Sequence, residues 1–371
     1  MKDKYVIHID IMWMLFLLII PLTGIAYVGW HLWTLLPLAN VWKAVIITVG
    51  IVCFLMLFFD LSGRLEKLPL PLSRILYEVG TSSVIVLLYL AMTFLVLDLG
   101  RLLHLVPRSW LYANGVTAVA LLGYLLTVFI CANIHYKDKV RVPLELKTKK
   151  PLTRDYTIVM ASDLHLGYHN TRSDLARWVD MMNAEQPDLV LIAGDIRDIS
   201  VHPLLVENMA EEFHRLQAPV YACLGNHEYY SQESRAKQFY ADAGIHLLKD
   251  SCAVFGDLCI IGRDDRANRQ RANLRKLMQQ ADSTKYCILL DHQPYHLEQA
   301  EQVGIDFQMS GHTHEGQIWP ISWMTHALYE CAWGAYRRGQ THYYVSSGLG
   351  IWGGKFRIGT QSEYVVVKLK H

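Results

Sequence analysis

The first part of the chain contains four long apolar stretches separated by short polar segments. Each is nearly free of charge and close to the roughly 20 residues that a helix needs to cross a bilayer. A single stretch of this kind could be a buried core helix, but four in succession indicate a membrane domain. They cover residues 11–30, 41–59, 79–97 and 111–130. The first is too long, and too closely followed by the others, to be a cleaved signal peptide.

Lys and Arg flank these stretches unequally. Eleven lie on the side that carries both ends of the chain, and three lie on the other side. Because basic residues accumulate in cytoplasmic loops, we expect an inner or plasma membrane protein of a bacterial-type cell, with the part after the helices in the cytoplasm. Seven scattered cysteines without a CxxC pair are typical of a reducing compartment. The bilayer is therefore the first expected partner.

Beyond residue 151 the pattern changes to short apolar runs that alternate with helical patterns. Runs of this length are typical of strands covered on both faces, and their alternation with helices predicts a layered α/β domain. The expected strands are residues 156–161, 189–193, 220–224, 286–290, 307–310, 342–346 and 364–369. The helices expected between them are residues 173–185, 203–216, 232–243, 270–280 and 295–302.

These patterns predict the domain organisation. Residues 1–135 would form a four-helix transmembrane domain, residues 136–154 a basic juxtamembrane linker, and residues 155–371 the α/β domain. The net charge of +1 gives no reason to expect a nucleic-acid polymer as a partner. The oligomeric state stays open.

Metal-ligating residue types follow five of the expected strands. The motifs are Asp163-Leu-His165, Gly194-Asp195, Gly225-Asn226-His227-Glu228, His292 and Gly311-His312-Thr313-His314. Two ligands spaced as in Asp-x-His share one face of an extended chain and can bind one metal. A carboxylate such as Asp195 can bridge two cations, because it has two oxygens. The mixed nitrogen and oxygen set suits Mn, Fe or Zn better than calcium.

In this order, with about 31 residues between the first three Asp or Asn centres, the motifs resemble the calcineurin-like metallophosphoesterase family. The resemblance runs from about residue 155 to the end of the chain. It implies a two-sheet β-sandwich flanked by helices. A segment at residues 348–353, Gly-Leu-Gly-x-Trp-Gly, is similar to a membrane-anchored bacterial subgroup that includes UDP-diacylglucosamine pyrophosphohydrolase-like enzymes.

The resemblance also implies a role for each motif residue. Two divalent metals, most simply manganese, would hold a hydroxide that attacks phosphorus. The first metal would be bound by Asp163, His165 and His314, and the second by Asn226, His292 and His312, with Asp195 bridging them. His227 would be the catalytic residue that protonates the leaving group or stabilises the transition state. Asp198, Glu228 and Asp291 would support the ligands from behind, Asp291 by a hydrogen bond to a ligand imidazole.

Two further segments are candidates for substrate recognition. Arg263, Arg269 and Arg271 could bind phosphate, or could belong to a solvated lead-in to a helix. Residues 318–336, which begin with Ile318 and Trp319, could be an apolar flap for an acyl or prenyl chain, or could pack on the domain core.

We therefore expect a membrane-anchored dinuclear-metal phosphohydrolase that acts on a phosphoester or pyrophosphate of a lipid or lipid-linked substrate. A tethered phosphodiesterase for soluble cytoplasmic nucleotides is one alternative. A non-catalytic membrane scaffold is another.

Overall fold

The computed structural model describes residues 2–230 and 233–371, and it divides into one unit up to residue 130 and a second unit over residues 131–371. The side chains of residues 2–18 and 231–236 lie outside the description.

The first unit is helical. Its helices are α1 (Lys2–Leu35), α2 (Asn40–Leu55), α3 (Leu57–Leu61), α4 (Leu70–Leu102) and most of α5 (Gly115–Lys137). Among the described residues, three helical segments are long and apolar enough to cross a membrane: Asn40–Leu61, Leu70–Leu102 and Gly115–Lys137. The sequence predicts four spans, and the first of them, residues 11–30, falls partly on side chains outside the description. The described remainder, Ile19–Leu35, is a shorter apolar helix.

A polar network joins α1 to α4 inside this unit. The hydroxyl of Tyr27 donates a hydrogen bond of 2.8 Å to Oδ2 of Asp98, and Nε2 of the buried His31 lies 2.9 Å from the same oxygen. The ring of His31 stacks on Phe94 at a centroid distance of 4.5 Å. Sequence patterns do not reveal this network, because its members are about 70 residues apart and meet only when the helices pack.

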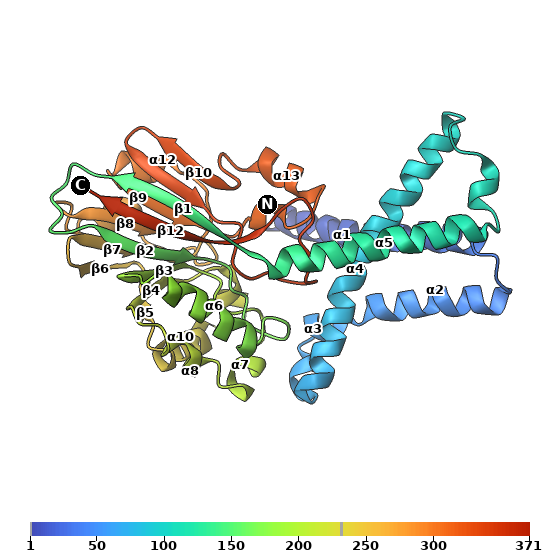
Figure 1. Ribbon diagram of the computed structural model, residues 1–371, viewed down its shortest axis with the longest axis horizontal. Helices are drawn as coiled ribbons and strands as arrows, with labels where there is room; N and C mark the ends of the chain where they lie inside the picture. Colours follow the sequence, from blue (N-terminus) through green and yellow to red (C-terminus); the bar gives the residue numbers. More distant parts are fainter. Residues whose placement is uncertain (1, 231–232) are drawn as a thin grey trace. The chain divides into compact units, whose positions relative to one another are not determined.

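The second unit contains two six-stranded sheets (Figure 1). The first sheet has the order β1-β12-β2-β3-β4-β5 and the second has the order β10-β11-β9-β8-β7-β6. The strands are β1 (Lys139–Lys147), β2 (Tyr156–Ala161), β3 (Leu189–Ala193), β4 (Val220–Cys223), β5 (His246–Leu247), β6 (Ser251–Phe255), β7 (Leu258–Gly262), β8 (Tyr286–Leu290), β9 (Phe307–Ser310), β10 (Gly334–Arg338), β11 (Thr341–Val345) and β12 (Ser362–Lys370). The predicted two-sheet architecture is confirmed.

The helices of this unit are short. They are α6 (Arg172–Ala184), α7 (His202–Val206), α8 (Ala210–Phe213), α9 (Asn226–Tyr230), α10 (Glu233–Asp242), α11 (Leu274–Met278), α12 (Glu298–Gln302) and α13 (Ile321–Leu328). The single helix expected at residues 203–216 is two helices, α7 and α8, because the chain turns at Asn208, which has a positive φ of 51°.

The alternation of side chains along each strand builds three apolar layers. Ile158 and Met160 of β2 point into the core between the two sheets, where they join Ile288 of β8 and Met309 of β9. Val159, between them, points to the opposite face. Period-2 alternation therefore places apolar side chains on both faces of a strand that is buried on both faces.

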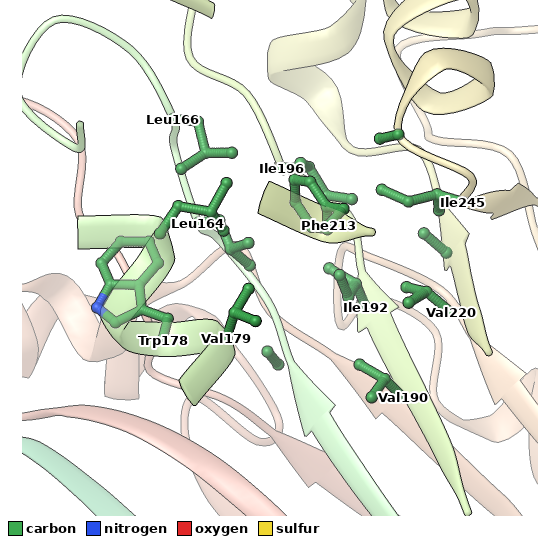
Figure 2. Packing of buried hydrophobic residues seen from close by; sticks show 14 of the residues in the cluster. Leu164, Leu166, Trp178, Val179, Val190, Ile192, Ile196, Phe213, Val220 and Ile245 are labelled. Carbon is green, nitrogen blue, oxygen red and sulfur yellow. The ribbon is translucent and has the colours of Figure 1, made fainter. Parts of the chain in front are cut away.

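Helices cover the outer face of the first sheet. Trp178 and Val179 of α6 pack with Phe213 of α8 against Val190 and Ile192 of β3, as Figure 2 shows. A separate cluster covers the outer face of the second sheet and includes Leu274 of α11 and Leu297, which precedes α12. Both sheets are thus held rigidly, which is the requirement for loops that must place ligands accurately.

The segment expected to be a linker, residues 136–154, instead contains strand β1. Residues Lys139–Lys147 pair in parallel with Ser362–Lys370 of β12 over the whole strand. Its residues alternate between exposed and part-buried, and Leu146 reaches the core between the sheets. The Lys and Arg residues in this stretch masked the alternation, because they occupy the solvent-facing positions of an edge strand.

Parallel pairing brings the ends of the strands to common edges. β2, β3 and β4 are parallel neighbours in the first sheet, as are β7, β8 and β9 in the second. Loops that leave the carboxyl ends of these strands are therefore close together, which is where open α/β sheets place their sites.

Candidate metal centre

Each predicted metal ligand lies at or just beyond the carboxyl end of a strand. Asp163 and His165 follow β2, Asp195 follows β3, Asn226 follows β4, His292 follows β8, and His312 and His314 follow β9. Six of the seven are at most 6% exposed, and His312 is partly buried. The fold therefore brings together all seven residues that the sequence predicts as ligands, from both sheets.

The first group consists of Asp163, His165 and His314. Nε2 of His314 lies 3.3 Å from Oδ1 of Asp163, and Nε2 of His165 lies 3.9 Å from the same oxygen. The two imidazole Nε2 atoms lie 3.0 Å apart. One ligand atom from each residue falls within 4.8 Å of the others, which is compatible with a single metal ion.

The second group consists of Asp195, His292 and His312, with Asn226 beside it. Nε2 of His292 lies 3.1 Å from Oδ2 of Asp195. Nδ1 of His312 lies 2.8 Å from Oδ1 of Asn226. Oδ2 of Asp195 is also 3.7 Å from Nε2 of His165 in the first group. Asp195 thus lies between the two groups, as a bridging carboxylate must.

The chemistry of these donors fits divalent metal ions. Nε2 of His292 is buried and has no hydrogen-bond partner in the described part of the chain, although a carboxylate oxygen is 3.1 Å away. An unpaired buried nitrogen is costly, and a cation between the two atoms would satisfy both. Burial lowers the pKa of His292, but the charges of Asp195 and Asp163 outweigh it and raise that pKa well above its usual value. The pocket therefore attracts positive charge, which a metal ion would supply in place of the proton.

The backbone at the site is strained. Five of the seven residues have a positive φ: Asp163 (53°), His165 (43°), Asp195 (50°), His312 (71°) and His314 (49°). Side chains other than glycine reach this region at a cost of about 1 kcal/mol or more each. The fold holds these side chains in the conformation that turns them toward one another.

Two glycines allow the loops to approach one another. Gly194 has a φ of 82°, and a Cβ atom there would lie 2.7 Å from Nδ1 of His292. A Cβ atom at Gly225 would lie 2.2 Å from Oδ1 of Asp195. Any side chain at these two positions would displace a predicted ligand, so the Gly before Asp195 and the Gly before Asn226 serve the site directly.

His227 lies beside the ligand groups, and one ligand atom each from His165, Asp195 and His227 also falls within 4.8 Å of the others. Nδ1 of His227 lies 2.9 Å from Oδ1 of Asp198, and its backbone N–H donates to Oδ1 of Asp195 at 2.9 Å. Burial lowers the pKa of His227, but the charge of Asp195 and the hydrogen bond with Asp198 raise it to about 9. His227 is therefore protonated at neutral pH, and Asp198 fixes the orientation of its ring.

Glu228 connects two of the loops that carry predicted ligands. Its fully buried carboxylate accepts hydrogen bonds from the backbone N–H groups of Gly225 at 2.7 Å, Asp195 at 3.2 Å and Arg197 at 3.3 Å. These contacts tie the loop after β4 to the loop after β3. This is the supporting role that the sequence predicts for Glu228.

Asp291 supports the site by a different contact from the one expected. Its two carboxylate oxygens bind the guanidinium groups of Arg263 and Arg271, each at 3.1 Å. Nδ1 of His292 pairs instead with the carbonyl oxygen of Ala193 at 2.7 Å. Ala193 is the last residue of β3, so this contact joins the two sheets, whereas the Asp291 side chain faces the arginines.

The four residues predicted to bind substrate lie in different surroundings. Arg263 and Arg271 are largely buried and bound to Asp291, so they order the loop after β7. Arg269 is exposed on the same loop, and Trp319 is partly exposed at the start of α13. A substrate contact for these residues stays a prediction.

The sequence patterns did not predict two features near the site. Arg357 is fully buried, and its Nη1 donates to the carbonyl oxygen of His314 at 2.7 Å. The guanidinium of Arg266 lies 4.2 Å from the ring centroid of Tyr295, whose hydroxyl is 2.8 Å from that of Tyr329. The ring of Tyr329 is 6.5 Å from that of His312. The density of Arg around residues 263–271 was a signal for the second feature, but it did not distinguish Arg266 from its neighbours.

Comparisons with known proteins agree with this geometry. Residues 156–316 match the family model described as calcineurin-like phosphoesterase. A metallophosphoesterase of Helicobacter pylori strain J99 is 30% identical over 262 residues, which cover 68% of this chain and 68% of that protein. The chain belongs to the calcineurin-like metallophosphoesterase family. Members of this family are metal-dependent phosphoesterases, and the family uses a dinuclear divalent metal site.

Two other relatives extend the comparison. A metallophosphoesterase of Campylobacter jejuni is 32% identical over 228 residues, which cover 59% of this chain and 60% of that protein. A protein of Danio rerio, named transmembrane protein with metallophosphoesterase domain, is 31% identical over 284 residues, 71% of this chain and 63% of that protein. The matches thus span less than two thirds of both relatives. The name of the second relative and the three apolar helices suggest that this metallophosphoesterase is a membrane protein.

Proposed function

We propose that this metallophosphoesterase is a membrane-anchored dinuclear-metal phosphohydrolase whose substrate is a phosphoester or pyrophosphate of a lipid or a lipid-linked precursor. The observation that carries the hydrolase is the pair of ligand groups joined by Asp195 Oδ2, which lies 3.1 Å from His292 and 3.7 Å from His165. The intact ligand set and the protonated His227 argue against a non-catalytic scaffold, because a scaffold needs no proton donor.

The seven predicted ligands would bind two metal ions. Two divalent ions, when bound, would supply the nucleophile and neutralise charge on the phosphate oxygens. Asp163, His165 and His314 would hold one ion, and Asn226, His292 and His312 the other. Asp195 would hold both and set their separation. Manganese is the first candidate, with iron or zinc as the others, because imidazole and oxygen donors are mixed.

His227 would donate its proton to the oxygen of the leaving group. Its Nδ1 lies 2.9 Å from Oδ1 of Asp198, so we take Nε2 as the nitrogen that would donate the proton. The hydrogen bond with Asp198 orients the ring of His227 for this proton transfer. Asp198 would act by positioning His227.

The proposed substrate class rests on the anchor. In the described part of the chain, three helical segments long and apolar enough to cross a membrane precede the catalytic domain, and tethering raises the local concentration of a membrane-borne substrate. We also propose that the catalytic domain lies in the cytoplasm of a bacterial-type cell, with residues 11–30 as a fourth span. The excess of Lys and Arg on one side of the four predicted spans supports this orientation. Arg266 lies over the ring of Tyr295, whose hydroxyl contacts that of Tyr329 beside His312, and we propose that Arg266 binds a phosphate beyond the scissile bond.

The test uses purified full-length protein with Mn²⁺. A substrate panel would include lipid phosphates, lipid-linked pyrophosphates, nucleotides and a chromogenic phosphodiester, with His227→Ala and Asp195→Asn as variants. Release of phosphate or nucleotide from lipid substrates, abolished by both substitutions, is the expected result. Turnover of soluble nucleotides alone would replace the lipid proposal with the tethered phosphodiesterase. No turnover of any substrate by metal-loaded protein would contradict the hydrolase.

A further inference from the structure

Helix α13 exposes its large apolar side chains. It begins seven residues after His314, and its exposed residues include Trp323 (67%), Met324 (61%) and Leu328 (72%). The buried residue of the helix is the small, polar Ser322. A helix that packs on a water-soluble domain shows the opposite distribution, with the apolar stripe inward. Packing on this domain therefore does not explain the apolar face of α13.

Neighbouring aromatic side chains extend the apolar face. Trp319 packs edge-to-face on Trp323, with ring centroids 5.4 Å apart. Trp352 is more than half exposed, and its carbonyl oxygen accepts a hydrogen bond of 3.0 Å from Nε2 of Gln317, two residues before Trp319. We call Trp319, Trp323, Met324, Leu328 and Trp352 the α13 surface. A group of exposed large apolar residues on one face marks an interaction site.

Backbone contacts connect the start of α13 to the last turns of α5. The N–H of Trp319 donates to the carbonyl oxygen of Ile358 at 2.7 Å. One residue earlier, the N–H of Arg357 donates to the carbonyl oxygen of Ala132 at 3.0 Å, and Nδ2 of Asn133 donates to the carbonyl oxygen of Lys355 at 3.0 Å. Ala132 and Asn133 belong to the end of α5 that lies in the second unit. The loop of residues 355–358 thus joins α13 to the end of an apolar helix long enough to cross a membrane.

We propose that the α13 surface lies in the headgroup region of the bilayer that α5 spans. Trp side chains favour this interface, and a short helix with one apolar face rests there with that face among the acyl chains. The bilayer is the favoured occupant because the hydrogen bonds of residues 357 and 358 connect the start of α13 to the end of α5, the helix that would enter the bilayer. The inference deepens the proposed function and rests on its membrane anchor. The start of α13 lies against the turn after His314, because a Cβ atom at Gly316 would lie 2.5 Å from the backbone N of Ser322. The interface would therefore lie beside the metal centre, and a lipid could reach it without leaving the membrane.

Site-specific photo-crosslinking tests the location. A photoreactive amino acid replaces Met324 or Leu328 in the full-length protein, which is placed in nanodiscs of phosphatidylethanolamine and phosphatidylglycerol. The control position is Val254 on edge strand β6, which is 54% exposed and so as accessible as Met324. Irradiation should give about tenfold more phospholipid adduct at 324 and 328 than at 254, because only the interface brings acyl chains within reach. Equal lipid adduct at all three positions, or adducts between two copies of the chain at 324, would overturn the proposal.

A kinetic comparison tests the consequence for the reaction. The triple substitution Trp323→Ser, Met324→Ser and Leu328→Ser should raise KM for a substrate embedded in the bilayer and leave kcat/KM for a soluble chromogenic diester unchanged. Val254→Ser is the matched control. An unchanged KM for the embedded substrate would refute the delivery role. If the wild-type protein cleaves no lipid, the proposed function fails, and the crosslinking yields decide the α13 surface on their own.

Discussion

At the residue scale, the metal centre depends on backbone conformations that its own side chains disfavour. Asp163, His165, Asp195, His312 and His314 all have positive φ. Each loop turns sharply after its strand, so that side chains from two sheets point to one place. The energy that maintains this strain comes from the apolar layers around the strands, in which Ile158, Met160 and Ile288 are fully buried.

The role of His227 gives the first prediction. His227→Ala should lower kcat by about 10²-fold to 10⁴-fold, the usual contribution of a general acid, and should leave the metal content at two ions per chain. Metal analysis and steady-state kinetics on the same preparation measure both quantities. His246→Ala is the control, since His246 is an exposed residue of β5. A variant that loses metal together with activity would show that His227 is a ligand instead.

The close approach at Gly194 gives the second prediction. A Cβ atom there would lie 2.7 Å from Nδ1 of His292, so Gly194→Ala should weaken metal binding by about 10-fold to 100-fold through displacement of that imidazole. Gly304→Ala is a matched control, because Gly304 has a similar φ of 77° with nothing within 4 Å of its Cβ position. Metal titration monitored by calorimetry measures the affinities. Equal losses in both variants would assign the effect to backbone strain alone.

At the element scale, β1 makes the chain after α5 part of the catalytic domain. Arg141 of β1 forms a bidentate ion pair with Glu185 at the end of α6, at 2.7 and 2.8 Å, and Tyr364 of β12 donates to the same carboxylate at 3.1 Å. The first strand, the last strand and the first helix of the domain therefore meet at one residue. A movement of the end of α5 would be transmitted to the sheet that carries Asp163 and Asp195.

The Glu185 contact gives the third prediction, a pH dependence. The hydrogen bonds from Arg141 lower the pKa of Glu185 below its usual 4.5. The stability that this contact contributes is therefore present above about pH 4.5 and is lost as the pH falls through the lower folded value. Glu185→Gln should cost about 1 kcal/mol at pH 7, because Arg141 is partly exposed and the pair is screened by solvent. The difference from the wild type should shrink as the pH is lowered toward 4.

Thermal unfolding of the full-length protein in detergent measures this difference. Glu145→Gln is the control. Glu145 lies on β1, as Arg141 does, and forms an exposed ion pair with Lys370 at 3.2 Å. Its substitution should therefore change the unfolding temperature little at pH 7 or at pH 4. A constant difference between Glu185→Gln and the wild type across the pH range would contradict the ionic origin of the stabilisation.

At the scale of the whole molecule, the metal centre joins the two sheets. Its ligands come from β2, β3 and β4 of the first sheet and from β8 and β9 of the second. The carboxylates of Asp163 and Asp195 are buried, and in the absence of cations they repel each other, which is one cause of the raised pKa of Asp163 after burial itself. Metal ions would remove that repulsion and link the sheets directly.

Metal removal is the fourth prediction. Stripping the protein with a chelator should lower the unfolding temperature of the catalytic domain, and Mn²⁺ at 100 times its Kd should restore about 2.7 kcal/mol for each site that binds only the folded state. Asp195→Asn should abolish most of this response, because the residue contacts both groups. Differential scanning calorimetry with and without Mn²⁺ decides the matter. Equal unfolding temperatures for stripped and loaded wild-type protein would mean that the centre contributes nothing to stability.

The accuracy of the sequence-based predictions differed between elements for physical reasons. Strands β2, β3, β8 and β9 were predicted with their observed bounds, because each is a short, largely apolar run followed at once by Gly or a polar residue. β1 and β10 were missed, since edge strands carry charged residues at their solvent-facing positions. β5, β6 and β7 were missed as well, although β7 is a buried apolar run between β6 and β8. The network around His31 and Asp98 was missed because its parts belong to different helices.

The sequence by itself determined which residues can bind metal and the order in which they occur. Residue type and spacing express donor chemistry and local backbone geometry, and both are properties of short segments. Only the tertiary structure decided which of the many Arg and aromatic side chains lie near the centre. It placed Arg266 beside Tyr295, directed Arg263 and Arg271 to Asp291, and left the apolar side of α13 exposed. Such contacts join residues far apart in the chain, and their geometry depends on how the two sheets pack.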